Sequence, residues 1–196
     1  MNAPIAPPRL MTTEDLLALP DDGAERWLIR GQLRERRPEG PEMTYRNRTH
    51  SAVEANVVFV LKRWLHQQPR PRGRVYSGEA GCRLHRDPDT TVGVDVVYFT
   101  AEQVAQQPVD TTLLEGAPVL VVEILSPSGT EEQINEKVAA YLGVGVPLVW
   151  LIDPYFRTVT VYRPDAEPSL FNVTQELSAE PHLPGFQVRV AELFDD

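Results

Sequence analysis

Residues 119–142 read VLVVEILSPSGTEEQINEKVAAYL. The run from Val119 to Leu125 is almost wholly apolar and has the length of a strand, which is typical of a central strand covered on both faces. The polar group that follows, Thr130-Glu-Glu-Gln133, has the form of a capping box and predicts a helix that continues to about Leu142. A buried strand followed by a capped helix indicates an α/β protein.

One long helix and four further strands are predicted around this unit. Apolar residues at helical spacing predict a helix over roughly Arg48 to Gln67, which Pro69 ends. Bounded apolar runs predict two strands joined by the turn His85–Asp89, and later two strands that form a β-hairpin. These four strands are expected at 75–84, 92–99, 148–152 and 158–162.

The two ends of the chain give weaker patterns. Thr12 or Thr13 can cap a short helix that stops before Pro20. Trp27 to Arg34 is predicted as a strand with Gly31 at a bend or tight turn, and the proline-rich tail is expected to end in a short helix over 190–194. The order of elements predicts one domain, a mixed sheet with helices on both sides, preceded by a flexible tail over residues 1–11.

Composition fits such a domain. The 196 residues are 42% hydrophobic and 24% charged, and no apolar run approaches the roughly 18 residues of a membrane-spanning helix. The N-terminal residues lack the features of a secretory signal, and the lone Cys82 cannot form an internal disulfide. We therefore expect a cytoplasmic protein, in which Cys82 is a packed thiol rather than a nucleophile.

The charge distribution leaves two interpretations open. The net charge of −9 argues against a nucleic-acid partner, because phosphate binding depends on lysine and arginine. Residues 26–74, however, contain 12 of the 19 basic residues and only four acidic ones, so this segment is +8 and the remainder −17. Either one side of the molecule faces a polyanion, or these arginines simply solvate one strand and one helix.

Two acidic residues interrupt otherwise apolar strands. Asp95 lies within VGVDVVYF (92–99) and Glu123 within VLVVEIL. A carboxylate is expensive to bury without a compensating cation. Each acid could form an ion pair with an arginine or sit at a solvated strand end, but two acids in consecutive core strands before a capped helix favour a shared divalent metal.

Lys137 and Tyr141 follow on one face of the helix predicted after Glu123, four residues apart. Their neighbours Val138 and Ala140 indicate that this face is partly buried. Lys137 there could orient a metal-bound water or stabilise charge that develops at phosphorus. The alternative is a surface lysine paired with Glu132 or Glu136.

The combined string Asp95 … Glu123-Ile-Leu-Ser-Pro-Ser128 … Lys137 … Tyr141 … Gly145-Val-Pro-Leu-Val-Trp150 … Asp153-Pro resembles the Uma2 (DUF820) family of the PD-(D/E)XK nuclease superfamily. The resemblance extends from about Thr12 to Phe194. It implies a restriction-endonuclease-like fold and the hydrolysis of nucleic-acid phosphodiesters, with DNA as the expected substrate and Mg²⁺ or Mn²⁺ as the cofactor.

The resemblance also implies roles for individual residues. Asp95, Glu123 and the backbone carbonyl of Ile124 would hold the metal, and Lys137 would place or deprotonate the attacking water. Glu54, His50 and Tyr141 are possible additional site residues, although a solvent-facing Glu54 paired with an arginine is the better expectation, and a capping or packing role explains His50 equally well.

The chain departs from the pattern of the superfamily in three places. Val94 stands where a proline precedes the aspartate, and the strand lysine of Glu-x-Lys is replaced by Leu125, so that Lys137 from the following helix is the expected substitute. Many similar sequences also carry a glutamate where this chain has Trp27; Glu25, two residues earlier, would point the same way in a strand.

Two other classes of function stay open. A non-catalytic module that binds nucleic acid or protein would suit the overall acidity and the missing strand lysine. A serine hydrolase using Ser126 or Ser128 is disfavoured, because no Gly-x-Ser-x-Gly elbow is present and both serines precede a helix start, where hydroxyls are ordinary capping groups. Related nucleases often dimerise, so a homodimer is possible.

Overall fold

The computed structural model describes residues 9–37, 47–126 and 130–195. Most of the expected N-terminal tail, residues 1–8, lies outside these residues, as do Arg46 and Ser128. Within the described ranges, no helix combines the length and the apolar character that crossing a membrane requires.

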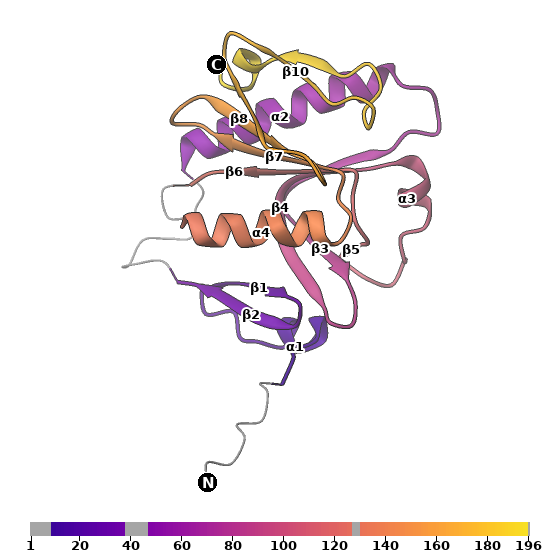
Figure 1. Cartoon of the computed structure of the whole chain (residues 1–196). Coiled ribbons are helices and arrows are strands. Elements are labelled where there is room, and N and C mark those ends of the chain that lie inside the picture. The colour runs from indigo at the N-terminus through magenta and orange to yellow at the C-terminus, as the bar shows by residue number, and fades with distance from the viewer. Residues whose placement is uncertain (1–8, 38–46, 127–129, 196) are drawn as a thin grey trace.

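A nine-stranded mixed sheet forms the centre of the molecule (Figure 1). Its main order is β2-β1-β4-β6-β7-β8-β9, with β3 paired to β4 and β5 paired to β3, while β10 and β11 form a separate pair. The strands are β1 (Glu25–Ile29), β2 (Gln32–Arg36), β3 (Arg74–His85), β4 (Thr90–Phe99), β5 (Leu114–Glu115), β6 (Leu120–Ile124), β7 (Leu148–Asp153), β8 (Thr158–Tyr162), β9 (Ser169–Asn172), β10 (Glu176–Ser178) and β11 (Gln187–Arg189).

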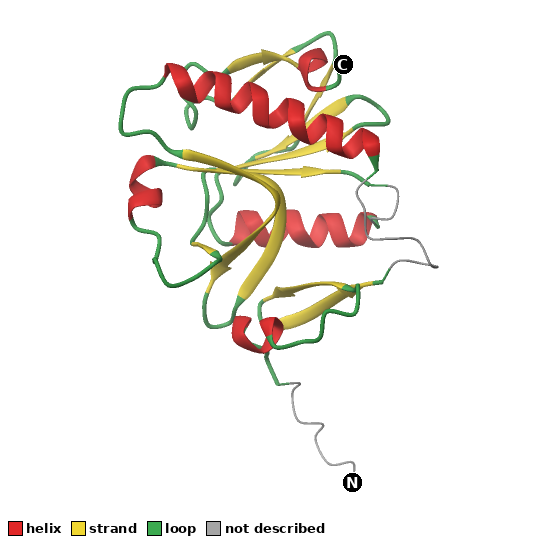
Figure 2. Cartoon of the chain, turned by 180° about the vertical axis from the view of Figure 1, so that it is seen from behind, coloured by secondary structure: helices red, strands yellow, loops and turns green. Residues whose placement is uncertain are grey.

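Helices cover both faces of this sheet, as Figures 1 and 2 show from opposite sides. The long helix α2 lies on one face and α4 on the other. The helices are α1 (Thr13–Leu17), α2 (Arg48–Gln67), α3 (Ala101–Ala105), α4 (Glu131–Gly143) and the 3₁₀ helix η1 (Val190–Leu193).

The α2 side holds the larger core. The apolar stripe of α2 packs on alternate residues of β4, β6 and β7 and on the C-terminal strands. Trp64 joins these layers, because its ring lies edge-on to Tyr98 and Phe186 and its indole N–H donates to the Pro184 carbonyl. The C-terminal segment therefore completes the core over α2.

The α4 side is enclosed from below by the β1–β2 hairpin (Figure 1). Val138 and Tyr141 of α4 share a buried cluster with Trp27 of β1 and Val121 of β6. Arg34 of β2 binds the Glu136 carboxylate of α4 through a hydrogen-bonded ion pair. Helix α4 thus lies between the β1–β2 hairpin and the remainder of the sheet.

The β4 strand has an opening along one edge. Its other edge pairs with β3 along nearly the whole strand. The edge of β4 opposite β3 is shared by two strands: β1 pairs only with Thr91, and β6 pairs only with residues 96–98. Residues 92–95 thus lie where the neighbouring strand changes from β1 to β6.

The buried face of β4 also changes at this point. Val94 belongs to the cluster beneath α4, whereas Val96, two residues on, belongs to the cluster beneath α2. A regular strand would put both valines on one face. Asp95 lies between them, at the opening in the edge.

Most of the predicted elements are confirmed, with three corrections. Helices α2 and α4 and strands β3, β4, β6, β7 and β8 lie where the patterns indicate, and the capping box at Thr130 is formed. The single strand predicted at 27–34 is wrong, because Arg30 and Gly31 both have positive φ and form the turn of a hairpin. The C-terminal tail ends in the predicted short helix, which is a 3₁₀ helix, but it also contains three short strands that were not predicted, and α3 and β5 have no counterpart among the predicted elements.

Candidate active site

Asp95 occupies the place of a missing backbone partner. The β4–β6 ladder stops at the pair Val96–Val122, and the Asp95 carboxylate accepts the next available N–H, that of Ile124, at 2.8 Å. The side chain is almost fully buried. One oxygen of this carboxylate therefore bridges the two strands at the point where they separate.

His50 approaches the same carboxylate from α2. Its backbone N–H donates to the Asn47 side chain that caps the helix, and its buried ring places Nε2 3.2 Å from Asp95 Oδ2. Neither ring nitrogen has hydrogen-bond geometry to a described residue, so the His50–Asp95 contact is a close approach rather than a formed hydrogen bond. His50 lies behind Asp95, on the side away from solvent.

Within the described residues Glu54 meets no arginine, contrary to that expectation. Its carboxylate accepts the backbone N–H of Gly78 at 2.7 Å and lies 3.9 Å from Nδ1 of His50. Glu54 thereby ties α2 to β3. Glu54 contacts His50, which in turn touches Asp95, but Glu54 does not contact Asp95 itself.

Glu123 projects from β6 toward α4. The ammonium of Lys137 lies 3.3 and 3.4 Å from its two oxygens, and the Tyr141 hydroxyl donates a short hydrogen bond to Oε1. Burial raises the pKa of this carboxyl and the Asp95 charge raises it further, while Lys137 lowers it. Burial, and next the charge of Glu123, raise the pKa of Tyr141, which keeps its hydroxyl a donor.

Lys137 is a cleft residue and not a surface lysine. The alternative of pairing with Glu132 or Glu136 is wrong, because within the described residues the Lys137 ammonium pairs with Glu123. Besides Glu123, Lys137 Nζ contacts the carbonyl of Gly93 at 3.4 Å, and it lies 5.6 Å from the centre of the Trp27 ring. The side chain is 16% exposed, so its charge faces the cleft with limited solvent around it.

One cleft brings together four of the seven residues that the pattern singled out. Asp95, Glu123, Ile124 and Lys137 all line it. His50, Glu54 and Tyr141 do not, and they act only behind the residues of the lining. Ser126 lies at the same cleft, beyond Leu125.

The cleft also contains a pair that the sequence pattern did not identify. Glu25 and Arg36 are register partners across the β1–β2 hairpin, and their side chains form an ion pair in the cleft wall. Glu25 and Trp27 line the cleft together, as their spacing in a strand predicts. Arg36 could have been found only by placing Gly31 at the turn of a hairpin.

The donor set fits one divalent cation whose remaining coordination positions are open to water or phosphate. Asp95 and Glu123 line one cleft, and their negative charges oppose each other, which a cation would relieve. Within the described residues no three His, Cys, Asp or Glu side chains form a closed metal cage. Mg²⁺ is commonly held by one or two carboxylates with water and phosphate in its other positions, so a two-carboxylate site with a backbone carbonyl is sufficient.

The four arginines Arg26, Arg34, Arg36 and Arg37 of the basic segment are compensated in the fold. The arginines of the hairpin pair with acidic residues nearby or on α4, which reduces the positive field that the sequence alone indicates. The pairs are Arg26 with Asp22 and Glu35, Arg34 with Glu136, Arg36 with Glu25, and Arg37 with Asp22 and Glu35.

Cys82 is a packed thiol, as expected. It is fully buried, and its S–H lies 3.4 Å from the Ala80 carbonyl. Burial raises the pKa of Cys82 to about 12, so the thiolate that a nucleophile needs is not available.

Comparison with known proteins agrees with this geometry. A model of the Uma2 family, described as "Putative restriction endonuclease", matches residues 13–191. The crystal structure of a "putative nuclease belonging to DUF820" from Anabaena variabilis ATCC 29413 matches with a TM-score of 0.74 and 23% identity, over 94% of this chain and 97% of that one. At this identity the likeness establishes the fold, a nuclease-like mixed sheet flanked by helices. No curated protein matches the sequence.

Proposed function

The chain belongs to the Uma2 family, and from this premise we propose that it is a metal-dependent endonuclease that hydrolyses phosphodiester bonds of nucleic acid, with DNA as the expected substrate. The observation that carries the proposal is the cleft at the β4–β6 opening, where two carboxylates and one ammonium meet. This combination suits the binding of a cation together with an anionic phosphate.

The proposed ligands of Mg²⁺ or Mn²⁺ are the carboxylates of Asp95 and Glu123 and the backbone carbonyl of Ile124. When bound, such an ion lowers the pKa of a coordinated water and offsets the charge of the phosphate oxygens. Asp95 is held by the Ile124 N–H, and Glu123 by Tyr141 and Lys137. Residues behind a metal ligand fix its orientation, and removing them typically weakens metal affinity about 10- to 100-fold.

Lys137 supplies the positive charge that the protein itself contributes. Its ammonium orients a water molecule near the phosphate and stabilises the negative charge that develops at phosphorus. Trp27 covers one side of this ammonium and limits its exposure, which strengthens its electrostatic effect.

A second function is favoured by a different observation. Within the described residues no group of three His, Cys, Asp or Glu side chains could hold a metal ion, and the hairpin arginines named above are paired with acids. A non-catalytic module that binds nucleic acid or protein would keep this fold without needing a metal. The two functions differ in metal affinity.

Calorimetric titration of Mn²⁺ into the protein separates them. We expect binding by the wild type, loss of binding in Asp95→Asn and Glu123→Gln, and loss of Mn²⁺-dependent cleavage of plasmid and single-stranded DNA in both. Each substitution keeps the shape of the side chain, and circular dichroism checks that the fold is retained.

Glu192→Gln is the matched control, because Glu192 is a partly exposed carboxylate that is paired with Arg63. In sequence, Glu192 is distant from the residues that line the cleft. The Glu192→Gln variant should bind Mn²⁺ like the wild type. Full cleavage by either site variant would contradict the site assignment, and a wild type that binds no Mn²⁺ even with DNA present would favour the non-catalytic module.

A further inference from the structure

Two adjacent aromatic side chains are exposed at the tip of the β7–β8 turn. Tyr155 is 91% and Phe156 76% exposed. Single exposed apolar side chains are normal on a protein surface, whereas adjacent large ones suggest a contact surface. The other large hydrophobic residues exposed in the described ranges are scattered: Leu10, Leu17, Phe59, Val109 and Leu170.

This turn lies at the same end of the sheet as the candidate active site. Strand β7 runs parallel to β6, with Leu151 opposite Glu123 and Ile152 opposite Ile124. The Leu125 N–H still bonds to the Ile152 carbonyl, so the end of β7 adjoins the rim of the cleft. At about 3.3 Å per strand residue, the tip of the turn lies roughly 10–15 Å from Glu123.

The aromatic pair is held in place rather than loosely attached. The Asp153 carboxylate accepts the backbone N–H groups of Tyr155 and Phe156 at 2.8 and 3.0 Å. The two rings meet edge-on, with their centres 6.0 Å apart. On the far side of the turn, Arg157 binds Asp195 at 3.0 Å and lies over the Phe194 ring. The rings are therefore presented to solvent in a defined arrangement at little cost in conformational entropy.

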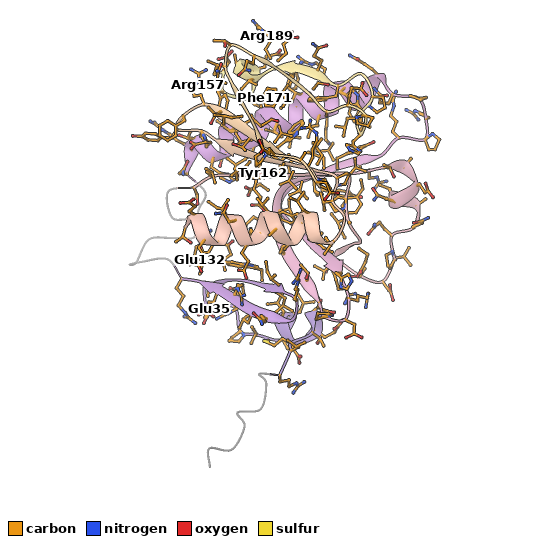
Figure 3. All side chains as sticks on the ribbon, viewed as in Figure 1. Glu35, Glu132, Arg157, Tyr162, Phe171 and Arg189 are labelled. Carbon is orange, nitrogen blue, oxygen red and sulfur yellow. The ribbon has the colours of Figure 1, made fainter. Side chains whose placement is uncertain are left out.

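The charges near this end of the sheet offer little attraction to phosphate groups. Figure 3 shows Arg157 above and Glu132 below on the same side of the molecule. Glu131 and Glu132 open α4, and the Arg157 charge is already paired with Asp195. Attraction of phosphates alone is weak here, whereas aromatic rings bind any nucleobase through its flat face, without a need for positive charge.

We propose that Tyr155 and Phe156 form a stacking platform for unpaired bases of a nucleic-acid strand whose backbone passes through the cleft. The inference rests on the proposed function and deepens it, because it assigns the substrate class as a strand with accessible bases, either single-stranded or locally opened. The distance from Glu123 corresponds to a few nucleotide steps at about 3.4 Å each in a stacked strand. The platform would fix the strand's position relative to the site without reading its sequence.

The test compares two oligonucleotides of equal length and charge, one of thymidines and one of abasic residues, in EDTA so that no cleavage occurs. Fluorescence anisotropy should show that the wild type binds the thymidine strand more tightly, by roughly tenfold or more. The double variant Tyr155→Ala/Phe156→Ala should lose this preference and bind both strands with the affinity that the wild type has for the abasic one. Tyr155→Phe, which keeps the ring, should retain the preference.

Phe59→Ala is the control, because Phe59 is an exposed aromatic residue in the middle of α2, outside this turn. It should leave the preference unchanged. A double variant that still prefers the thymidine strand, or a wild type that binds both strands equally, would overturn the platform while Mn²⁺-dependent cleavage in a parallel assay leaves the nuclease assignment intact. A wild type that neither binds DNA nor cleaves it would overturn both. Loss of a dimer in the double variant, measured by sedimentation, would assign the rings to a subunit contact and overturn the proposal.

Discussion

Asp95 and Glu123 are both buried acids, but they are accommodated in different ways. Asp95 accepts a backbone N–H that the separating strands leave without a ladder partner. Glu123 depends on two side chains of α4, Lys137 and Tyr141. Because the burial of Glu123 outweighs the help from Lys137, its pKa is raised, and its charged form is a source of instability in the metal-free protein.

Replacing Glu123 by glutamine should therefore stabilise the metal-free fold at neutral pH. A raised pKa in the folded state means that the native protein binds the proton more tightly than the unfolded chain does. Wild-type stability from this group is highest below 4.5, the ordinary pKa of a glutamate side chain, and declines as the pH rises toward the raised pKa of the folded state. Above that raised pKa we expect Glu123→Gln to melt roughly 2–4 °C higher, which corresponds to about 1 kcal/mol in a chain of this size.

Thermal melts in EDTA from acidic to mildly alkaline pH measure this difference. The gap between variant and wild type should be near zero at the acidic end and grow with pH. Glu192→Gln provides the reference, because Arg63 lowers the pKa of Glu192 and the sign is opposite. A Glu123→Gln variant that is less stable than the wild type at every pH would show that the Lys137 pair outweighs the burial.

Among the elements, the β1–β2 hairpin has the largest influence on the cleft that could not be predicted from the sequence pattern. It supplies Glu25, Trp27 and Arg36 to the wall and holds α4 through Arg34. Its turn consists of Arg30 at φ 51° and Gly31 at φ 73°, and added atoms at Gly31 would meet the Leu10 Cβ at 2.8 Å. Two residues at positive φ form the turn type that best matches the twist of paired strands, but arginine is an unfavourable first residue there.

Arg30→Asn should stabilise the protein by roughly 0.5–1 kcal/mol, because asparagine tolerates positive φ better than arginine. Gly31→Ala should destabilise it by about 1–2 kcal/mol, through backbone strain and the contact with Leu10. Urea unfolding of the two variants measures both effects, with Gly23→Ala as a control at positive φ in open space. Equal losses in Gly31→Ala and Gly23→Ala would mean that strain alone, and not the contact, sets the effect.

The elements also show how much of the fold can be predicted from the sequence. Long apolar patterns with caps predict α2, α4 and the strands around Asp95 and Glu123 almost residue by residue, since there burial and local signals agree. The hairpin has the pattern of one strand because Arg30 is an untypical residue for its turn. Strands β9, β10 and β11 are three or four residues long and take their stability from packing over α2, which no local pattern reveals.

The candidate site divides in the same way. Two acids in apolar strands and a lysine on the next helix can be identified from their spacing, and they do share a cleft. The pairing of Glu25 with Arg36 and the contact of His50 with Asp95 depend on tertiary approach between distant segments. Such contacts are not encoded in any short window of sequence.

At the scale of the whole molecule, the net charge of −9 limits how strongly nucleic acid is attracted. Arginines in the hairpin are engaged with acids, so their charges are less available to neutralise phosphates. Arg36 differs from the other paired arginines of the hairpin, because it lines the cleft beside Glu25 and could exchange that partner for a phosphate.

Binding of single-stranded DNA should accordingly depend on salt only moderately. With about two or three phosphates neutralised, the plot of log affinity against log salt concentration should have a slope of about −2. Arg36→Gln should reduce the steepness by about 0.7, whereas Arg189→Gln, on the C-terminal strand, should not change it. A slope steeper than about −4 would contradict the expectation that only two or three phosphates are neutralised.

The hydrogen bond from Ile124 to Asp95 has a consequence for how this chain could change over evolutionary time. Because the carboxylate completes the hydrogen bonding of a backbone group, it is needed by the sheet as well as by the proposed chemistry. A descendant that lost its activity could replace Glu123 or Lys137 freely, but at position 95 it would have to keep an acceptor, aspartate or asparagine. Drift after loss of function should thus erase the signature of catalysis unevenly, with the aspartate the last part to disappear.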